Sequence, residues 1–174
     1  MPVLNKKPRD TRGTSTAEFP MALGILLLFI LFPLIDLGSI ALGTSSVHNA
    51  ARVGATEASR GQSCNDAITK GKTFATSQAT GGVTITQDDV QVTAQKVKIL
   101  DTDQAAPEEI TPLPTAQEID KSQYIYQIKV TVTGQVRPII LLSTFFGNIP
   151  GLTQPLTVTA ESTATFENPF NLAK

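Results

Sequence analysis

The stretch RGTSTAEFPMALGILLLFILFPLID, residues 12–36, decides how this chain is organised. It contains an uncharged apolar run of 17 residues, Phe19 to Ile35, with a carboxylate at each end, Glu18 and Asp36. The run measures about 26 Å as an α-helix, and apolar residues continue beyond Asp36, so a tilted helix here can cross a bilayer. A carboxylate costs much less at a membrane surface than at the bilayer centre. We therefore expect Glu18 at the inner edge of the membrane and Asp36 near the outer edge.

The charges of the chain are unevenly distributed. Four basic residues against Asp10 give the first 13 residues a formal charge of +3, which leaves −4 for the rest of a 174-residue chain whose total is −1. A basic segment before an apolar span is held inside the cell by the positive-inside rule. Nucleic-acid-binding proteins instead cluster Lys and Arg on the folded domain, so we expect a membrane and no nucleic acid among the partners.

Two simple interpretations compete for the apolar run. A secretory signal peptide also has a basic head, but its apolar region is about 7 to 15 residues long and ends at a cleavage site of small residues. The sequence SIALG, residues 39–43, could serve as such a site and would place the mature start near Gly43. A plain single-span anchor that is never cut explains the length and the charge, but it gives no reason for Glu18.

The residues before the span suggest a third interpretation. The sequence GTSTAEF, residues 13–19, resembles the processing site of type IV prepilins, and it is most similar to the Tad (tight adherence) branch, in which Gly is followed by four residues, Glu and an aromatic. The resemblance implies that a membrane-embedded aspartic prepilin peptidase cuts between Gly13 and Thr14 on the cytoplasmic side. The apolar helix then remains attached as the anchor.

The same resemblance implies roles for Glu18 and Phe19 in subunit assembly. After the cut, Thr14 is the new first residue, Glu18 is the fifth, and the aromatic Phe19 follows it. The charge of Glu18 can then pair with the new α-amino group of a neighbouring subunit at the membrane edge. A buried charge is tolerated only when it is paired.

The helix is expected to continue beyond the span. Its small residues recur every three or four positions and so lie on one face: Gly43, Val47, Ala50, Ala51, Gly54 and Ala58. Small residues allow close helix approach, as in membrane interfaces. The pattern leaves two partners open, another helix or the chain's own domain.

A second helix is predicted after Gly61. Ser63, with Asp66 three residues later, is typical of a capping box, and Gly81-Gly82 is the expected end. The residues expected on its buried side are Ala67, Ile68, Gly71, Phe74 and Ala75.

Beyond Gly82 the apolar period changes to two, which indicates half-buried strands. The strands are expected within 83–98, broken by a turn at Asp88-Asp89, and within 124–136 and 156–166. Half-buried strands of this kind favour an antiparallel sheet with one face covered by helices. The fold class is therefore α+β: a long N-terminal transmembrane helix and a small extracytoplasmic domain in which a helix packs on an antiparallel sheet. The expected division is a cytoplasmic leader at 1–13, a transmembrane and extended helix at 14–60 and the domain at 61–174.

Two other segments have distinct compositions. Residues 101–120 hold six acids, three prolines and no basic residue, which predicts an exposed loop. Asp101 and Asp103 have the first spacing of an EF-hand loop, but the required Gly and Glu do not follow. Residues 137–152, RPIILLSTFFGNIPGL, are strongly apolar. We expect a buried short helix or strand edge there, with a subunit or membrane-surface contact as the alternative.

Catalytic chemistry is not indicated. The chain has a single histidine, His48, and a single cysteine, Cys64, which cannot form an internal disulfide. A nucleophile and base pair would have to be built around His48 alone. We therefore expect no enzyme activity, no catalytic residue, no metal site and no cofactor.

The resemblance extends over the whole chain in its general composition and order of elements. With HNAARVGA at 48–55 and VTAESTATFE at 158–167, the sequence resembles the TadE-like minor pilins, or pseudopilins, of the Tad/Flp type IVb pilus system. The resemblance implies a structural subunit of an adhesion pilus, whose partners are the prepilin peptidase, other Tad pilin subunits, the assembly machinery and the membrane. It implies a single pass through the bacterial cytoplasmic (inner) membrane, with the N-terminus in the cytoplasm. The alternative is an uncleaved, single-span membrane-anchored extracytoplasmic binding domain.

Overall fold

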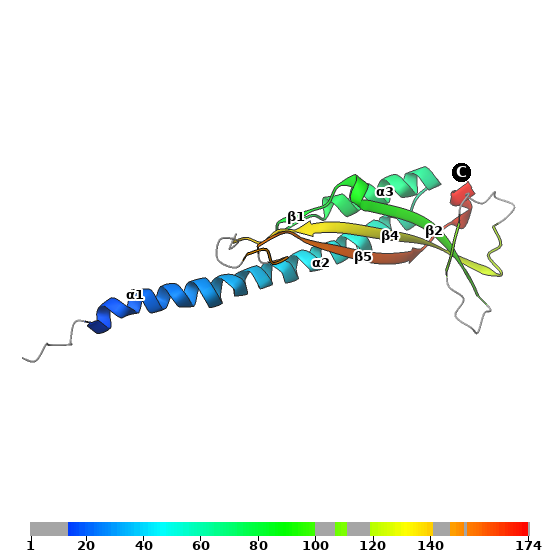
Figure 1. Cartoon of the computed structure of the whole chain (residues 1–174). Helices are drawn as coiled ribbons and strands as arrows, with labels where there is room; N and C mark the ends of the chain where they lie inside the picture. The colour runs from blue at the N-terminus through cyan, green and yellow to red at the C-terminus, as the bar shows by residue number, and fades with distance from the viewer. Residues whose placement is uncertain (1–13, 100–106, 111–118, 141–146, 152, 174) are drawn as a thin grey trace, which may run out of the picture.

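One long helix runs through the whole molecule and carries a small domain on its second half (Figure 1). The computed structural model describes residues 14–99, 107–110, 119–140, 147–151 and 153–173. The long helix consists of α1 (Thr14–Leu26), a π-helical turn η2 (Leu27–Leu31) and α2 (Phe32–Ser59). A shorter helix, α3 (Cys64–Ser77), packs beside α2.

The sheet is antiparallel and is built around its longest strand. Its strands are β1 (Val83–Thr84), β2 (Val90–Lys98), β3 (Glu108–Glu109), β4 (Tyr124–Val136) and β5 (Leu156–Thr165). On one side β4 pairs with β2, from Val90 opposite Val132 to Lys98 opposite Tyr124, and then with β1; on the other side it pairs with β5. The prediction of an α+β fold with an antiparallel sheet is confirmed.

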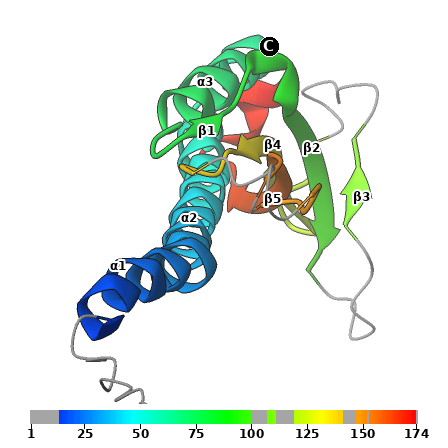
Figure 2. The same ribbon diagram turned by 60° about the vertical axis from the view of Figure 1, so that its left-hand side comes forward.

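The two helices cover one face of this sheet, α2 over β4 and β5 and α3 over β2 (Figure 2). The alternation predicted for β4 is confirmed, since its buried apolar residues are Tyr126, Ile128, Val130, Val132 and Val136. The opposite face is polar and carries the ion pair of Lys129 Nζ with Glu161 Oε2 at 2.7 Å. The sheet is therefore apolar toward the helices and hydrophilic on its other side.

The start of α3 follows the predicted capping arrangement. Ser63 Oγ accepts a hydrogen bond from the Asp66 backbone N–H at 3.1 Å. The Asp66 carboxylate accepts in turn from the backbone N–H of Gln62, one residue before the N-cap, at 2.8 Å. Two N–H groups at the open end of the helix are thus satisfied by side chains.

The end of α3 differs from the prediction. The helix stops at Ser77, with Gln78 as its C-cap, rather than at Gly81-Gly82. The two glycines form a turn with φ of 67° and 81°, backbone angles that favour glycine. Phe74, expected on the buried side, is 41% exposed. Local spacing correctly placed Ala67, Gly71 and Ala75 in the core, but it could not show how far the covered face extends.

The two breaks predicted in the strand region had different outcomes. At Asp88-Asp89 the break is confirmed as a 3-10 turn (Gln87–Asp89), because the Asp89 carboxylate accepts from both the N–H and the hydroxyl of Thr86. The acidic stretch was predicted to be a loop, but its residues Glu108–Glu109 form β3. An ion pair of Lys96 Nζ with Glu108 Oε2 at 3.0 Å accompanies that pairing. Asp101 and Asp103 lie outside the described residues.

The small-residue face of α2 packs against the chain's own domain. Its core residues are at most 1% exposed: Val47, Ala50, Ala51, Ala55 and Ala58. At Gly54 an added Cβ would lie 3.0 Å from both the Gly71 carbonyl oxygen and the Ala75 Cβ. The absence of a side chain at Gly54 therefore allows α2 and α3 to approach each other closely, and the question left open by the spacing is answered.

Candidate functional site

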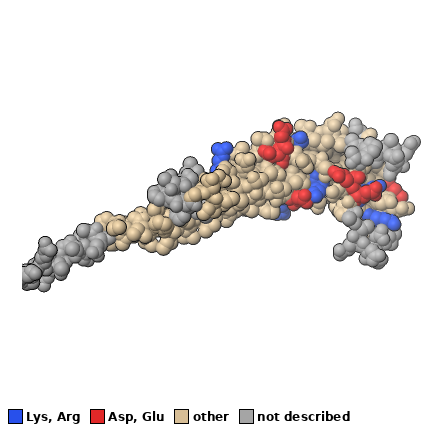
Figure 3. Space-filling model, viewed as in Figure 1, with Lys and Arg blue, Asp and Glu red and all other residues tan. Residues whose placement is uncertain are grey.

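The most distinctive surface of the protein is the first half of its long helix. Between Phe19 and Ile35 no side chain is buried. Figure 3 shows no charged side chain on this part of the helix, whereas Lys, Arg, Asp and Glu gather on the domain. In the part of the chain that the structure describes, this is the one helix long and apolar enough to cross a membrane. The exposed large apolar residues of this segment are Phe19, Met21, Leu23, Ile25, Leu26, Phe29, Ile30, Leu31, Leu34 and Ile35.

The exposed apolar segment from Phe19 to Ile35 is called the bare segment below. A π-helical turn interrupts it just before Pro33. The Phe32 N–H donates to the Leu27 carbonyl, five residues back instead of four. Proline lacks an N–H, and its ring collides with the carbonyl four residues earlier in a regular helix. The wider turn accommodates Pro33 within the helix.

Asp36 ends the bare segment. Its side chain is fully buried, and Oδ1 accepts hydrogen bonds from the backbone N–H groups of Ile139 and Ile140 at 3.0 and 2.9 Å. No described group hydrogen-bonds to Oδ2. The carboxylate therefore fastens the segment after β4 to the helix, across 103 residues of sequence.

Sequence reasoning missed this role of Asp36. The spacing of charges indicated only that a carboxylate falls near the outer end of the apolar run. The partners are backbone N–H groups, which every residue except proline carries, so side-chain identity at 139 and 140 gave no signal. Buried backbone N–H groups need an acceptor, and the Asp36 side chain supplies one for both Ile139 and Ile140.

Three of the four residues predicted for processing and assembly, Thr14, Glu18 and Phe19, belong to the start of α1. Gly13 is outside the described residues, and Thr14 is the first residue given for α1. Glu18 belongs to α1, but its side chain is outside what the structure describes. Phe19 is 68% exposed. The roles of Gly13, Thr14, Glu18 and Phe19 remain predictions.

The two residues considered for catalytic chemistry, His48 and Cys64, lie in different environments. His48 is exposed on α2, whereas Cys64 is buried at the start of α3, where burial raises the pKa of its thiol. A raised pKa disfavours the thiolate, which is the reactive form. The described residues contain no group of three or more His, Cys, Asp or Glu side chains that could hold a metal ion.

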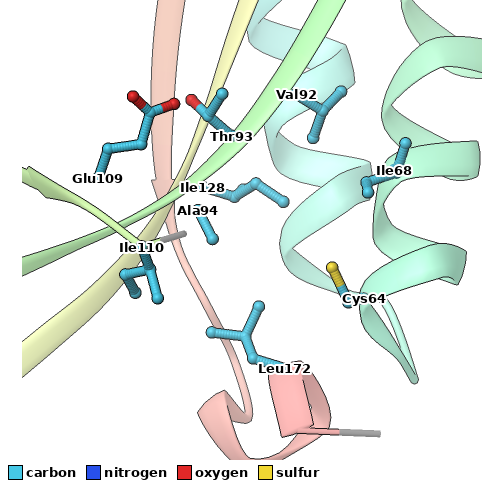
Figure 4. A pocket seen from close by; sticks show the side chains of 9 residues that line it. All are labelled: Cys64, Ile68, Val92, Thr93, Ala94, Glu109, Ile110, Ile128 and Leu172. Atoms are coloured by element: carbon cyan, nitrogen blue, oxygen red, sulfur yellow. The ribbon is translucent and has the colours of Figure 1, made fainter. Parts of the chain in front are cut away.

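A small apolar cavity lies between α3, β2 and the C-terminal 3-10 turn η4 (Pro169–Ala173). It has a volume of about 190 Å³. Figure 4 shows Ile68, Val92, Ile128 and Leu172 converging on it, with the sulfur of Cys64 at one side. Such a cavity can receive a small apolar group.

Neither a protein-family model, nor a curated protein, nor a solved structure matches the chain. The function is therefore inferred from the geometry of the chain's own residues. That geometry combines a bare apolar helix of membrane-spanning length with a folded domain attached from Asp36 onward.

Proposed function

We propose that this protein is a minor pilin-like structural subunit of a Tad-type adhesion pilus. Residues Phe19 to Ile35 anchor it as a single pass in the bacterial cytoplasmic membrane, with the basic leader in the cytoplasm and the domain outside. The observation that carries the proposal is the helical segment of 17 apolar residues that the domain leaves bare up to Asp36. Apolar side chains exposed over this length are stable in hydrocarbon and costly in water.

The segment also suits assembly among other pilin helices. The small-residue face of α2 is occupied by the chain's own sheet and α3, so it is not free for a neighbouring subunit. The bare segment contains no buried residue, so it is available first to lipid and then to the helices of other Tad pilin subunits. The protein thus acts through packing, as a structural component and not as an enzyme.

Processing supplies the group that fixes the register between subunits. The prepilin peptidase cuts between Gly13 and Thr14, and the new α-amino group pairs with Glu18 of a neighbouring subunit. Phe19, the next residue, then makes the first apolar contact between the two subunits. The support is the joint pattern of Gly13, Glu18 at the fifth position of the mature chain, an aromatic and an adjoining apolar span.

The second candidate is an uncleaved, single-span anchored domain that binds a ligand outside the cytoplasm. The apolar cavity beside Cys64 favours it, because its volume of about 190 Å³ suits a small apolar group. This candidate leaves Glu18 without a role.

The test is the N-terminal residue and intact mass of the protein extracted from membranes, after expression with and without a prepilin peptidase. We expect a start at Thr14 only when the peptidase is present, and a Gly13→Leu variant should stay uncut as a control. An uncut Met1 start in both cultures would favour the second candidate. A start near Gly43 would show that the run is a signal peptide.

The role of Glu18 has its own test. Glu18→Ala should leave membrane insertion intact but abolish incorporation into pili, measured by the amount of subunit in sheared filaments. Asp10→Asn, which removes a carboxylate from the leader, should assemble normally. Normal assembly of Glu18→Ala would contradict the pairing with the α-amino group.

A further inference from the structure

The end of the domain nearest the bare helix is apolar and exposed. From Pro138 to Ala160 the sequence contains no charged residue. Ile139 is 70% exposed and Ile149 is 41% exposed, so the prediction of a buried helix or strand edge at 137–152 is wrong at these two positions. Residues 141–146 and 152 lie outside the described part. Because Ile139 and the neighbouring helix are both apolar and exposed, the same apolar surroundings would stabilise both.

The height of Ile139 along the helix is fixed by Asp36. The backbone N–H groups of Ile139 and Ile140 hydrogen-bond directly to the Asp36 carboxylate, at 3.0 and 2.9 Å. Ile35, the last residue of the bare segment, precedes Asp36 by one helical step, about 1.5 Å. A bilayer that receives the helix as far as Ile35 therefore has Ile139 at its surface. Figure 1 shows this end of the sheet beside the point where the helix emerges from the domain.

The surface around Ile139 continues the apolar character of the helix. Ile35, Leu42 and Ile139, with the Gly81-Gly82 turn, line an open groove of about 570 Å³ that is almost entirely apolar. Leu42 is 72% exposed although it lies beyond Asp36. Leu42 thus continues the exposed apolar surface along α2, and Ile139 extends it sideways onto the end of the domain.

A basic residue borders this apolar end. Arg137 is exposed and immediately precedes the uncharged stretch. Arg and Lys beside apolar surface are typical of the membrane interface, where the cation reaches lipid phosphates. A surface that faces water has no need of a basic residue at the border of an apolar patch.

We propose that this end of the domain, the membrane-facing end formed by Leu42, Ile139 and the Gly81-Gly82 turn, rests on the outer surface of the bilayer. Its apolar side chains enter the boundary between headgroups and acyl chains, and Arg137 contacts lipid phosphate. Asp36 is a positioning residue that joins this end to the helix. The inference rests on the proposed anchoring of Phe19 to Ile35 in the membrane.

The test places a fluorescent probe at three positions of the full chain in vesicles of phosphatidylethanolamine and phosphatidylglycerol. Single cysteines replace Ile139, Ile25 in the bare segment, and Ile99, an isoleucine that is 48% exposed just beyond the opposite end of β2. Cys64→Ser provides the cysteine-free parent, with Cys64→Ala as a second parent should serine disturb the fold. Each cysteine carries an environment-sensitive dye, and lipids with nitroxide groups at different depths act as quenchers.

We expect deep quenching at Ile25→Cys, shallow quenching at the boundary between headgroups and acyl chains at Ile139→Cys, and none at Ile99→Cys. A dye at 139 that is as solvent-exposed as the one at 99, while the dye at 25 is quenched, would overturn the inference and leave the anchoring intact. A blue-shifted dye at 139 that lipid nitroxides do not quench would identify a second copy of the chain as the occupant and also overturn it. No quenching at 25 would overturn both the anchoring and the inference.

Discussion

The two halves of the long helix differ in what surrounds them, although both are rich in apolar residues. Between Phe19 and Ile35 the helix carries many Leu, Ile and Phe side chains, and none of the 17 residues is buried. Between Val47 and Ser59 it carries mostly Ala, Gly and Val, and the residues facing the sheet are almost completely buried. Small side chains let backbones approach closely, whereas large ones keep them apart and suit lipid. Side-chain size therefore distinguishes a helix built for protein packing from one built for a membrane.

The largest effect is expected from a charge in the bare segment. Leu26 is 49% exposed and lies near its middle. Leu26→Arg should cost about 3 kcal/mol of membrane insertion, roughly a hundredfold, as measured by the fraction of protein that integrates into membranes. In detergent the unfolding of the domain should not change. Leu26→Ala is the control, and equal insertion of the Arg and Ala variants would contradict a membrane-spanning role.

A branched side chain in the packed half should instead damage the domain. Gly54→Val would place atoms against the Gly71 carbonyl and Ala75, which leave no room for a Cβ without movement. We expect a loss of about 2 kcal/mol in the free energy of unfolding, measured by denaturant titration of the full chain in detergent. Gly24→Val is the matched control in the bare half, because nothing lies within 4 Å of a Cβ built there. Similar losses of unfolding free energy in both variants would contradict the difference in packing between the two halves of the helix.

A substitution at Asp36, where the two halves of the helix meet, should affect mainly the segment that Asp36 holds. Asp36→Ala leaves the N–H groups of Ile139 and Ile140 without their acceptor, which costs about 1–3 kcal/mol. Amide exchange at 139 and 140 should accelerate by about tenfold to a hundredfold, read by hydrogen-exchange mass spectrometry. Ser39→Ala is the control, since Ser39 is buried one turn further along and its hydroxyl has no hydrogen-bond partner among the described residues. Unchanged protection in Asp36→Ala would mean that the carboxylate does not fasten this segment.

The smallest effect is expected from pH at the start of α3. The Gln62 N–H, and then the Lys70 side chain, lower the pKa of Asp66. A carboxyl whose pKa is lower in the folded state stabilises the fold fully above its unfolded value of about 4, and this contribution is lost as the pH falls through the folded value. The melting temperature should decline below about pH 4, with a shallower decline in Asp66→Asn. Parallel curves for the two proteins would show that Asp66 contributes nothing to the acid response.

The local patterns of the sequence determined most of the secondary structure. The apolar run, the capping pair Ser63 and Asp66, the break at Asp88-Asp89 and the alternation in β4 all depend on neighbours within a few residues, and each is confirmed. They failed where the outcome depends on distant partners. Glu108–Glu109 became a strand because β2 offers an edge, and α3 ended before its predicted glycines.

The candidate site shows the same division. The sequence by itself determined that an apolar helical run of membrane-spanning length follows Glu18 and that small residues share one face of its continuation. Only the tertiary structure decided that this face meets the chain's own sheet, that Asp36 holds Ile139 and Ile140, and that Ile139 remains exposed. The physical reason is that periodicity fixes which residues share a face, whereas the partner of that face comes from contacts between segments about a hundred residues apart.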